Sequence, residues 1–165
     1  MFRALALGLL VILWTSHSRA DAPLPASESR TFTSANGRFA AITTASSGTR
    51  VVEVATGRER WRIPGWYRLL FVSNDGAKLV TVYDGLNLLP LDHTPELVLL
   101  TFWREGREIA KVTVKDIAPS RSSLRRTISH YHWGDILGLD DSGELRIRTA
   151  GGSEVRYDLE GGRTK

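Results

Sequence analysis

The stretch Arg58-Glu-Arg-Trp-Arg-Ile63 decides the fold class of this chain. Glutamate, tryptophan and isoleucine occupy every second position, and arginines fill the positions between them. Because successive side chains of a β-strand point to opposite faces of the sheet, this alternation predicts a strand with one half-buried face. The stretches Glu144–Thr149 and Val155–Leu159 alternate in the same way.

The rest of the chain favours an all-β, antiparallel protein. Turn-forming residues recur at short intervals, and no long window after the N-terminal segment keeps a helical period, although Lys115–Leu124 has room for one short helical turn. Counting the runs between turn signals predicts about 12 strands. We place them near residues 30–34, 38–44, 49–55, 58–63, 67–73, 78–83, 96–103, 107–114, 127–133, 136–140, 144–149 and 153–159.

A repeat organises these strands. Phe32-Thr-Ser-Ala-Asn-Gly37 matches Phe71-Val-Ser-Asn-Asp-Gly76, and more loosely Leu137-Gly-Leu-Asp-Asp-Ser-Gly143. Each copy is followed by two strands and then by a second glycine turn beside an arginine, at Gly57, Gly106 and Gly162. The repeat therefore predicts three units of four strands each.

Two insertions interrupt the repeat. The first, Asp84–Pro95, lies inside the second unit, and the other separates the second unit from the third. The first insertion carries Leu86, Leu88, Leu89 and Leu91, which is too apolar for a freely solvated loop. We expect it to pack over the sheet, the alternative being an apolar patch offered to a partner.

The order of turns and strands resembles the blade repeat of β-propellers, especially the WD-like repeats of secreted bacterial proteins. The resemblance covers Thr31–Ile63 and Leu69–Val114, and Ile136–Arg163 less well. It implies four-stranded antiparallel units and carries no catalytic residues with it. Since closed propellers usually have four or more blades, three units leave an incomplete propeller, a stack of sheets and a sandwich open.

The N-terminus predicts export. Residues 1–20 read as a signal peptide, with Arg3 before an apolar run and Ser18-Arg19-Ala20 at the cleavage position. We expect a flexible lead-in at residues 21–29, a single β-repeat domain at 30–163, and a secreted or periplasmic location. The chain has 165 residues and no cysteine, which excludes disulfides and thiolate metal sites. No run reaches the roughly 20 apolar residues of a membrane-spanning helix.

The charge of the chain is small. The formal net charge is +4, and two of the basic residues, Arg3 and Arg19, belong to the predicted signal peptide. A balance this weak does not favour a nucleic-acid partner. It leaves a protein or a glycan as the expected partner, and the oligomeric state stays open.

His130 and His132 are the candidate metal ligands. Their spacing places both imidazoles on one face of a strand, where they could hold zinc or copper. A third ligand would have to come from His93, Asp92 or Asp135, and we expect Gly134 to turn Asp135 away from the histidines. The favoured interpretation is therefore structural histidines and no cofactor, and a small periplasmic enzyme or metal-binding protein is the alternative.

Catalytic signatures are missing from the sequence. There is no Gly-x-Ser-x-Gly nucleophile motif, and Asp140-Asp141 falls where a turn uses aspartate for local hydrogen bonds. We expect a non-catalytic protein.

Two clusters are candidate binding residues. Trp61 and Trp66 lie among arginines, an arrangement that could stack sugars or bind an acidic polymer. The alternative is that Trp61 belongs to the core and the arginines form a solvated face. Arg121, Arg125 and Arg126 form a basic cluster in the second insertion, where we expect an exposed loop.

Overall fold

The computed structural model describes residues 26–164. The predicted signal peptide and the first part of the lead-in lie outside the described residues. Residues 26–29 are exposed and belong to no strand, and the first strand begins at Arg30.

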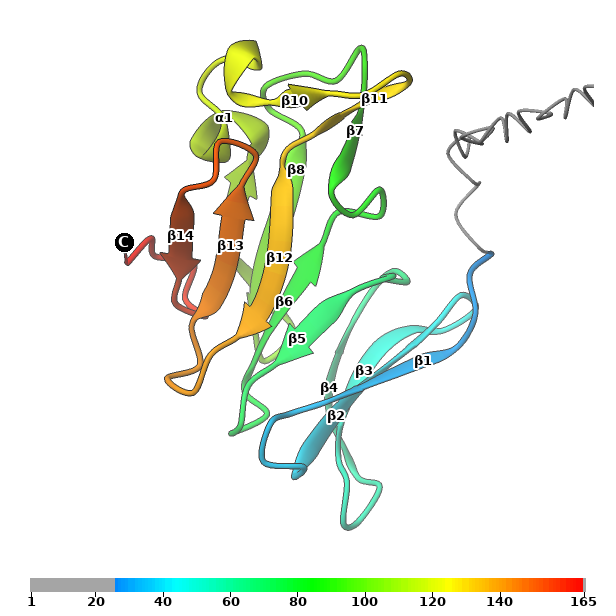
Figure 1. The fold of residues 1–165 in the computed structure, drawn as a ribbon. Helices are drawn as coiled ribbons and strands as arrows, with labels where there is room; N and C mark the ends of the chain where they lie inside the picture. The colour runs from blue at the N-terminus through cyan, green and yellow to red at the C-terminus, as the bar shows by residue number, and fades with distance from the viewer. Residues whose placement is uncertain (1–25, 165) are drawn as a thin grey trace, which may run out of the picture.

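The protein is all-β, as the alternation predicts, and its strands form four antiparallel sheets (Figure 1). The first sheet contains four strands in chain order: β1 (Arg30–Thr33), β2 (Phe39–Thr44), β3 (Gly48–Glu53) and β4 (Glu59–Ile63). The middle sheet has the order β5 (Leu70–Val72), β6 (Lys78–Val82), β8 (Val98–Arg104) and β9 (Arg107–Thr113). These two sheets are the first and second predicted units.

The third unit differs from its prediction. Its sheet, here called the third sheet, contains three strands, namely β12 (Gly134–Leu139), β13 (Leu145–Thr149) and β14 (Glu154–Tyr157). The fourth position holds only an isolated bridge between Tyr157 and Arg163. The strand predicted at 127–133 is wrong as a member of this unit, because its central residues pair elsewhere.

The two insertions pair with each other and form the insertion sheet. β11 (His130–His132) lies between β10 (Arg125–Arg126) and β7 (Leu88–Pro90), and β7 comes from the first insertion. Leu89 of β7 is fully buried and lies opposite Tyr131 in the register. The first insertion therefore packs against the protein through Leu89, as predicted, whereas its Leu91 is exposed.

One short helix connects the middle sheet to the second insertion. α1 (Val114–Ile117) begins where the Asp116 carboxylate accepts a 2.7 Å hydrogen bond from the backbone N–H of Thr113. A 3-10 turn, η1 (Arg121–Ser123), follows it. Both lie in or beside residues 115–124, where the sequence is compatible with one short helical turn.

The core has two parts, one on each face of the middle sheet. Leu70, Val72 and Leu79 pack against the first sheet, whereas Val80 and Phe102 pack toward the third sheet. Because β6 has neighbours on both faces, its residues 79–82 are all buried. The middle sheet therefore lies between the other two (Figure 1).

The repeated turns have equivalent geometry. The backbone N–H of Gly37 donates to Ser34 O, that of Gly76 to Ser73 O, and that of Gly143 to Asp140 O. All three glycines have positive φ, at 72°, 68° and 82°. A fourth turn, Asp158–Gly161, closes in the same way.

Candidate binding groove

Trp61 takes part in the packing between the first and middle sheets. Its indole N–H donates a 2.8 Å hydrogen bond to the carbonyl of Gly76, and its ring packs against the core between the first and middle sheets. The contact joins β4 to the repeated turn of the next unit. The ring of Trp61 therefore packs against the core, which was the alternative to sugar stacking.

Trp66 is also held by its own chain. Its indole N–H donates to the carbonyl of Glu28 at 2.7 Å. The guanidinium carbons of Arg68 and Arg30 lie 5.0 and 5.8 Å from the ring centroid, within cation–π range. Arg68 is buried and also bonds Asp84 at 3.1 Å. The predicted stacking residue thus contacts arginines of the same protein.

The three arginines of the second insertion do not act alike. Arg121 lies over the ring of Tyr131, 5.4 Å from its centroid, and donates to the carbonyl of Leu91 at 3.3 Å. Arg125 and Arg126 are exposed as predicted, although they form the short strand β10 rather than a loop. In Figure 1, β10 lies at the top of the molecule and β4 at the bottom, so Trp61 and these arginines do not form one site.

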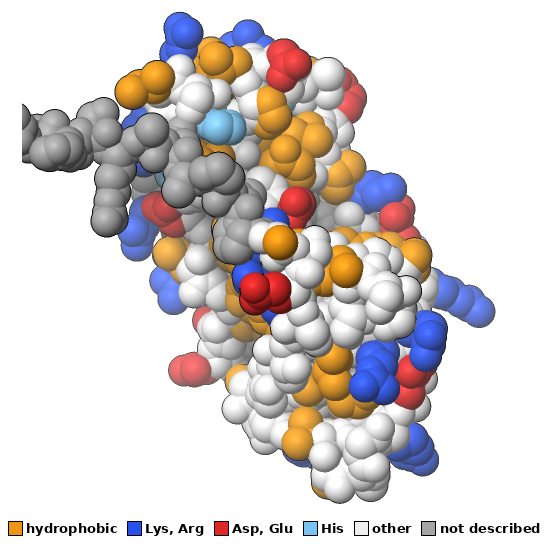
Figure 2. Space-filling model, turned by 90° about the vertical axis from the view of Figure 1, so that its right-hand side faces the viewer, with side chains coloured by type: hydrophobic (Ala, Val, Ile, Leu, Met, Phe, Trp, Pro, Cys, Tyr) orange, Lys and Arg blue, Asp and Glu red, His pale blue; other side chains and the backbone are white. Residues whose placement is uncertain are grey.

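The end of the molecule that carries the insertion sheet also exposes apolar side chains. Figure 2 shows hydrophobic side chains near the upper end, beside a histidine. Ile128, between β10 and β11, is 92% exposed, and Leu91 is 37% exposed.

The histidines lie in β11 with unequal surroundings. His132 is buried, its Nε2 lies 3.1 Å from Asp135 Oδ1, and its Nδ1 has no hydrogen-bond partner. The expectation that Asp135 turns away is wrong. Gly134 is the first residue of the extended strand β12, so it does not reverse the chain, and a Cβ there would lie 2.5 Å from the carbonyl of Arg148.

No third metal ligand joins the two histidines in the described part of the chain. His93 stacks edge-on against Tyr131, with 5.4 Å between ring centroids, and Tyr131 points to the opposite face of β11 from the two histidines. Residues 26–164 contain no group of three His, Asp or Glu side chains placed to hold a metal ion.

A groove that the sequence analysis did not identify runs along the first strands of the three units. Its apolar half is a hollow of about 300 Å³. Phe32 of β1, Phe71 of β5 and Leu139 of β12 line it, together with Leu69. Phe71 lies close to β12, since a Cβ on Gly138 would be 3.7 Å from its ring. In Figure 1, β12, β5 and β1 follow one another across the molecule.

The polar half of the groove lies at the repeated turns. This hollow of about 440 Å³ is lined by Ala35, by residues 73–75 and 139–144, by Asp158 and Leu159, and by Lys78. Ala35 and Leu139 line both hollows, so the two halves adjoin each other. We call the whole depression the inner groove. Both volumes lie in the range of small-ligand sites.

The turns that form the polar half are fastened to one another. The backbone N–H of Asn36 donates to the Asn74 side chain at 2.9 Å, and the Asn36 side chain donates to the Asn74 carbonyl at 2.8 Å. These paired bonds hold the turns of the first and second units side by side.

Two carboxylates of the polar half have a lowered pKa. Burial raises the pKa of Asp75, but hydrogen bonds from Ser73 and the Ala77 N–H and the charge of Lys78 lower it, and the net shift is downward. A hydrogen bond from the Ser142 hydroxyl is the main cause of the lowered pKa of Asp140. Among the described residues, Asp141 is exposed and makes no hydrogen bond or ion pair of its own.

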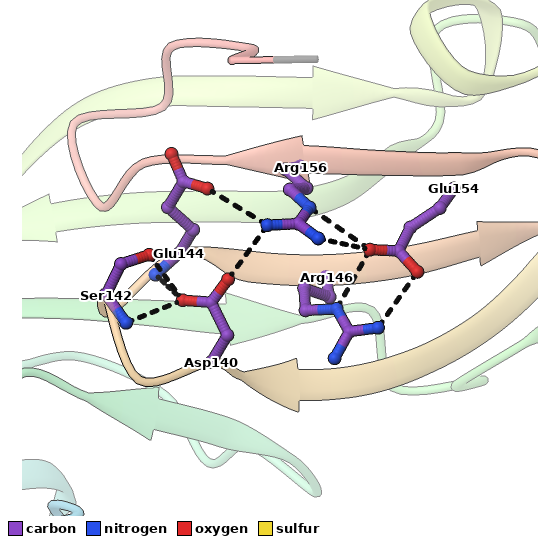
Figure 3. Close-up of polar contacts among 6 residues, drawn as sticks. All are labelled: Asp140, Ser142, Glu144, Arg146, Glu154 and Arg156. Atoms are coloured by element: carbon purple, nitrogen blue, oxygen red, sulfur yellow. Dashed lines mark hydrogen bonds and ion pairs between the residues drawn. The ribbon is translucent and has the colours of Figure 1, made fainter.

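An ion-pair network behind the groove anchors one of its turns (Figure 3). Asp140 accepts from Arg156 at 3.3 Å, and Arg156 also donates to Glu154 at 3.1 Å. Glu154 accepts two 2.9 Å bonds from Arg146, which are the main cause of a pKa lowered to about 2. The network crosses β13 and β14 on the charged face of the third sheet and holds the Asp140 turn in place.

Comparison with known proteins shows no family for this chain. No family model and no curated protein matches it. Among solved structures, hydrazine synthase of Kuenenia stuttgartiensis is similar over 82% of this chain and 35% of its own chain, with 16% identity and a TM-score of 0.41. The chain therefore spans about a third of that protein's chain, and a likeness at this TM-score supports no conclusion.

Within residues 26–164, no helix is long and apolar enough to span a membrane.

Proposed function

We propose that this protein is a secreted or periplasmic, non-catalytic β-repeat domain that binds a partner protein in the inner groove. One observation carries the proposal: the first strands of three units and their turns line two adjoining hollows, one apolar and one charged, that share Ala35 and Leu139. Binding sites are typically concave, mostly apolar, and supplied with a few polar groups that orient the ligand.

The groove lining favours a protein over a glycan. The indole N–H groups of Trp61 and Trp66, the residues suited to stack sugars, are bonded to carbonyls of the same chain. The aromatic rings of the groove are Phe32 and Phe71, beside leucines, a lining suited to apolar side chains.

We also infer that the first, middle and third sheets are the blades of an incomplete propeller. Three features support this arrangement. The middle sheet is covered on both faces, the first strands of the three sheets lie along one groove, and equivalent turns meet at its end. Closed propellers place the first strands of their blades around an axis in a comparable way.

The binding proposal is tested with immobilised mature protein and the exported fraction of the native cell. We expect wild-type protein to retain a partner protein that Asp141→Lys loses. Asp92→Lys is the matched control, because Asp92 is an exposed aspartate in the first insertion, outside the groove. Equal capture by Asp141→Lys, or capture of glycans alone, would contradict the proposal.

A further inference from the structure

The inner groove can accept only certain partner segments, because its two halves differ in chemistry. In the apolar half, the rings of Phe32 and Phe71 are partly buried and pack against the two parts of the core. Leu139 is partly buried at the junction with the polar half. These side chains are fixed by the core on one side and open on the other, which suits an aliphatic or aromatic side chain of a ligand.

In the polar half, negative charge predominates. Asp75, Asp140 and Asp158 accept turn hydrogen bonds, and those to Asp75 and Asp140 favour the ionised carboxylates. Asp141 adds a carboxylate that is exposed at the same site. These carboxylates favour a cation and disfavour an acidic ligand.

The one lysine of the lining offsets this charge only in part, through its effect on Asp75. The ammonium of Lys78 lies 2.8 Å from Glu160 Oε1, and Arg104 bonds the other carboxylate oxygen of Glu160. Lys78 is thus paired outside the row of aspartates. A cationic side chain of a ligand would meet Asp141 without competition from a lysine of the same protein.

On the basis of the proposed function, we infer that the inner groove recognises an extended segment of a partner protein with an apolar residue and, two positions away, a lysine or arginine. The apolar side chain lies in the half lined by Phe32, Phe71 and Leu139, and the cation lies against Asp141. Ala35 and Leu139 line both hollows, so the two side chains belong to one segment. In an extended segment, alternate side chains point to the same face and are about 6.6 Å apart along the chain, which suits two adjoining hollows.

The test uses an array of immobilised Ser-Gly decapeptides in which two central positions separated by one residue are varied through all residues. We expect wild-type protein to bind peptides that combine Leu, Ile, Val or Phe with Lys or Arg. Asp141→Asn should weaken that signal about fivefold and Asp141→Lys more than tenfold, since an ion pair is lost or replaced by repulsion. Asp92→Lys should bind like wild type. Higher salt should weaken binding, because it screens exposed charges.

The possible outcomes separate this inference from the proposed function. No peptide binding, a preference for acidic or wholly polar peptides, or equal binding by Asp141→Lys would overturn the inference. If the native fraction still yields a partner that Asp141→Lys loses, the proposed function stands alone. If Asp141→Lys also captures the partner as well as wild type does, both the inference and the proposed function are wrong. Asp141 is exposed, so its variants are expected to fold, and thermal unfolding curves check this.

Discussion

The ring of Phe39 occupies the space that a side chain at Gly76 would need. A Cβ on Gly76 would lie 2.3 Å from Cδ1 of Phe39, far inside van der Waals contact. Gly37, the equivalent glycine of the first unit, has a similar φ but no atom within 4 Å of the same position. At Gly76, both the positive φ and the contact with Phe39 favour glycine, whereas at Gly37 only the positive φ does.

This difference predicts unequal costs for the same substitution. Gly37→Ala should lower the free energy of unfolding by about 1 kcal/mol, the cost of an L-residue at positive φ. Gly76→Ala should pay that cost and a further ~1–3 kcal/mol for displacing Phe39. Urea unfolding followed by tryptophan fluorescence measures both.

Asparagine separates the two causes. Because asparagine tolerates positive φ, Gly37→Asn should be close to wild type, whereas Gly76→Asn should stay strongly destabilised by its Cβ. Equal stabilities of the two asparagine variants would show that the Phe39 contact has no energetic role.

A second prediction concerns acid sensitivity of the charged face. The pKa of Glu154 is lowered from 4.5 to about 2, mainly by hydrogen bonds from Arg146. A lowered pKa means that the stabilisation is complete above pH 4.5 and is lost as the pH falls from 4.5 toward 2. NMR titration of the Glu154 carboxyl carbon should show ionisation persisting below pH 4.5.

Removal of the partner should reverse this shift. In Arg146→Gln the pKa of Glu154 should move back toward its ordinary value. Arg62→Gln, which removes the partner of Glu59 in the first sheet, should leave it unchanged and serves as the control. A Glu154 pKa that is the same in wild type and Arg146→Gln would contradict the network of Figure 3.

A third prediction concerns metal. His130 and His132 supply two ligands at most, and a tetrahedral protein site needs at least three. Chelator-treated mature protein should therefore bind zinc no more tightly than a surface pair of histidines. Calorimetry tests this, and one equivalent bound below about 1 μM and lost in both His130→Ala and His132→Ala would establish the metal-binding alternative.

A fourth prediction concerns export. Cleavage is expected after Ala20, because the alternative site after Ala22 would place Pro23 first in the mature protein. N-terminal sequencing of exported protein should begin at Asp21. A soluble form in the cytoplasm that keeps residues 1–20 would contradict the secretory interpretation.

Local sequence patterns predicted most strands close to their positions in the structure. The alternation at residues 58–63 corresponds to β4, and the turn sequences ending in Gly37 and Gly76 lie where the repeat places them. Both signals depend on a few neighbouring residues. Side-chain alternation follows from strand geometry, and positive φ follows from the lack of a Cβ in glycine.

Strand pairing was less predictable where the insertions compete with the repeat. The sequence predicted a strand at 127–133 but not its partner. It pairs with β7, about 40 residues earlier in the chain, where Leu89 is buried in the core. Backbone hydrogen-bonding groups are the same in every strand, so they do not specify the partner.

The inner groove shows the same division between local and tertiary information. The sequence by itself determined that Asp75, Asp140 and Asp141 lie in turns, since aspartate and glycine favour turns through local hydrogen bonds and φ preferences. Only the tertiary structure decided that these turns meet, with Phe32 and Phe71 beside them. That meeting depends on the packing of the middle sheet between two others, and burial of apolar surface is non-directional and acts between residues far apart in the chain.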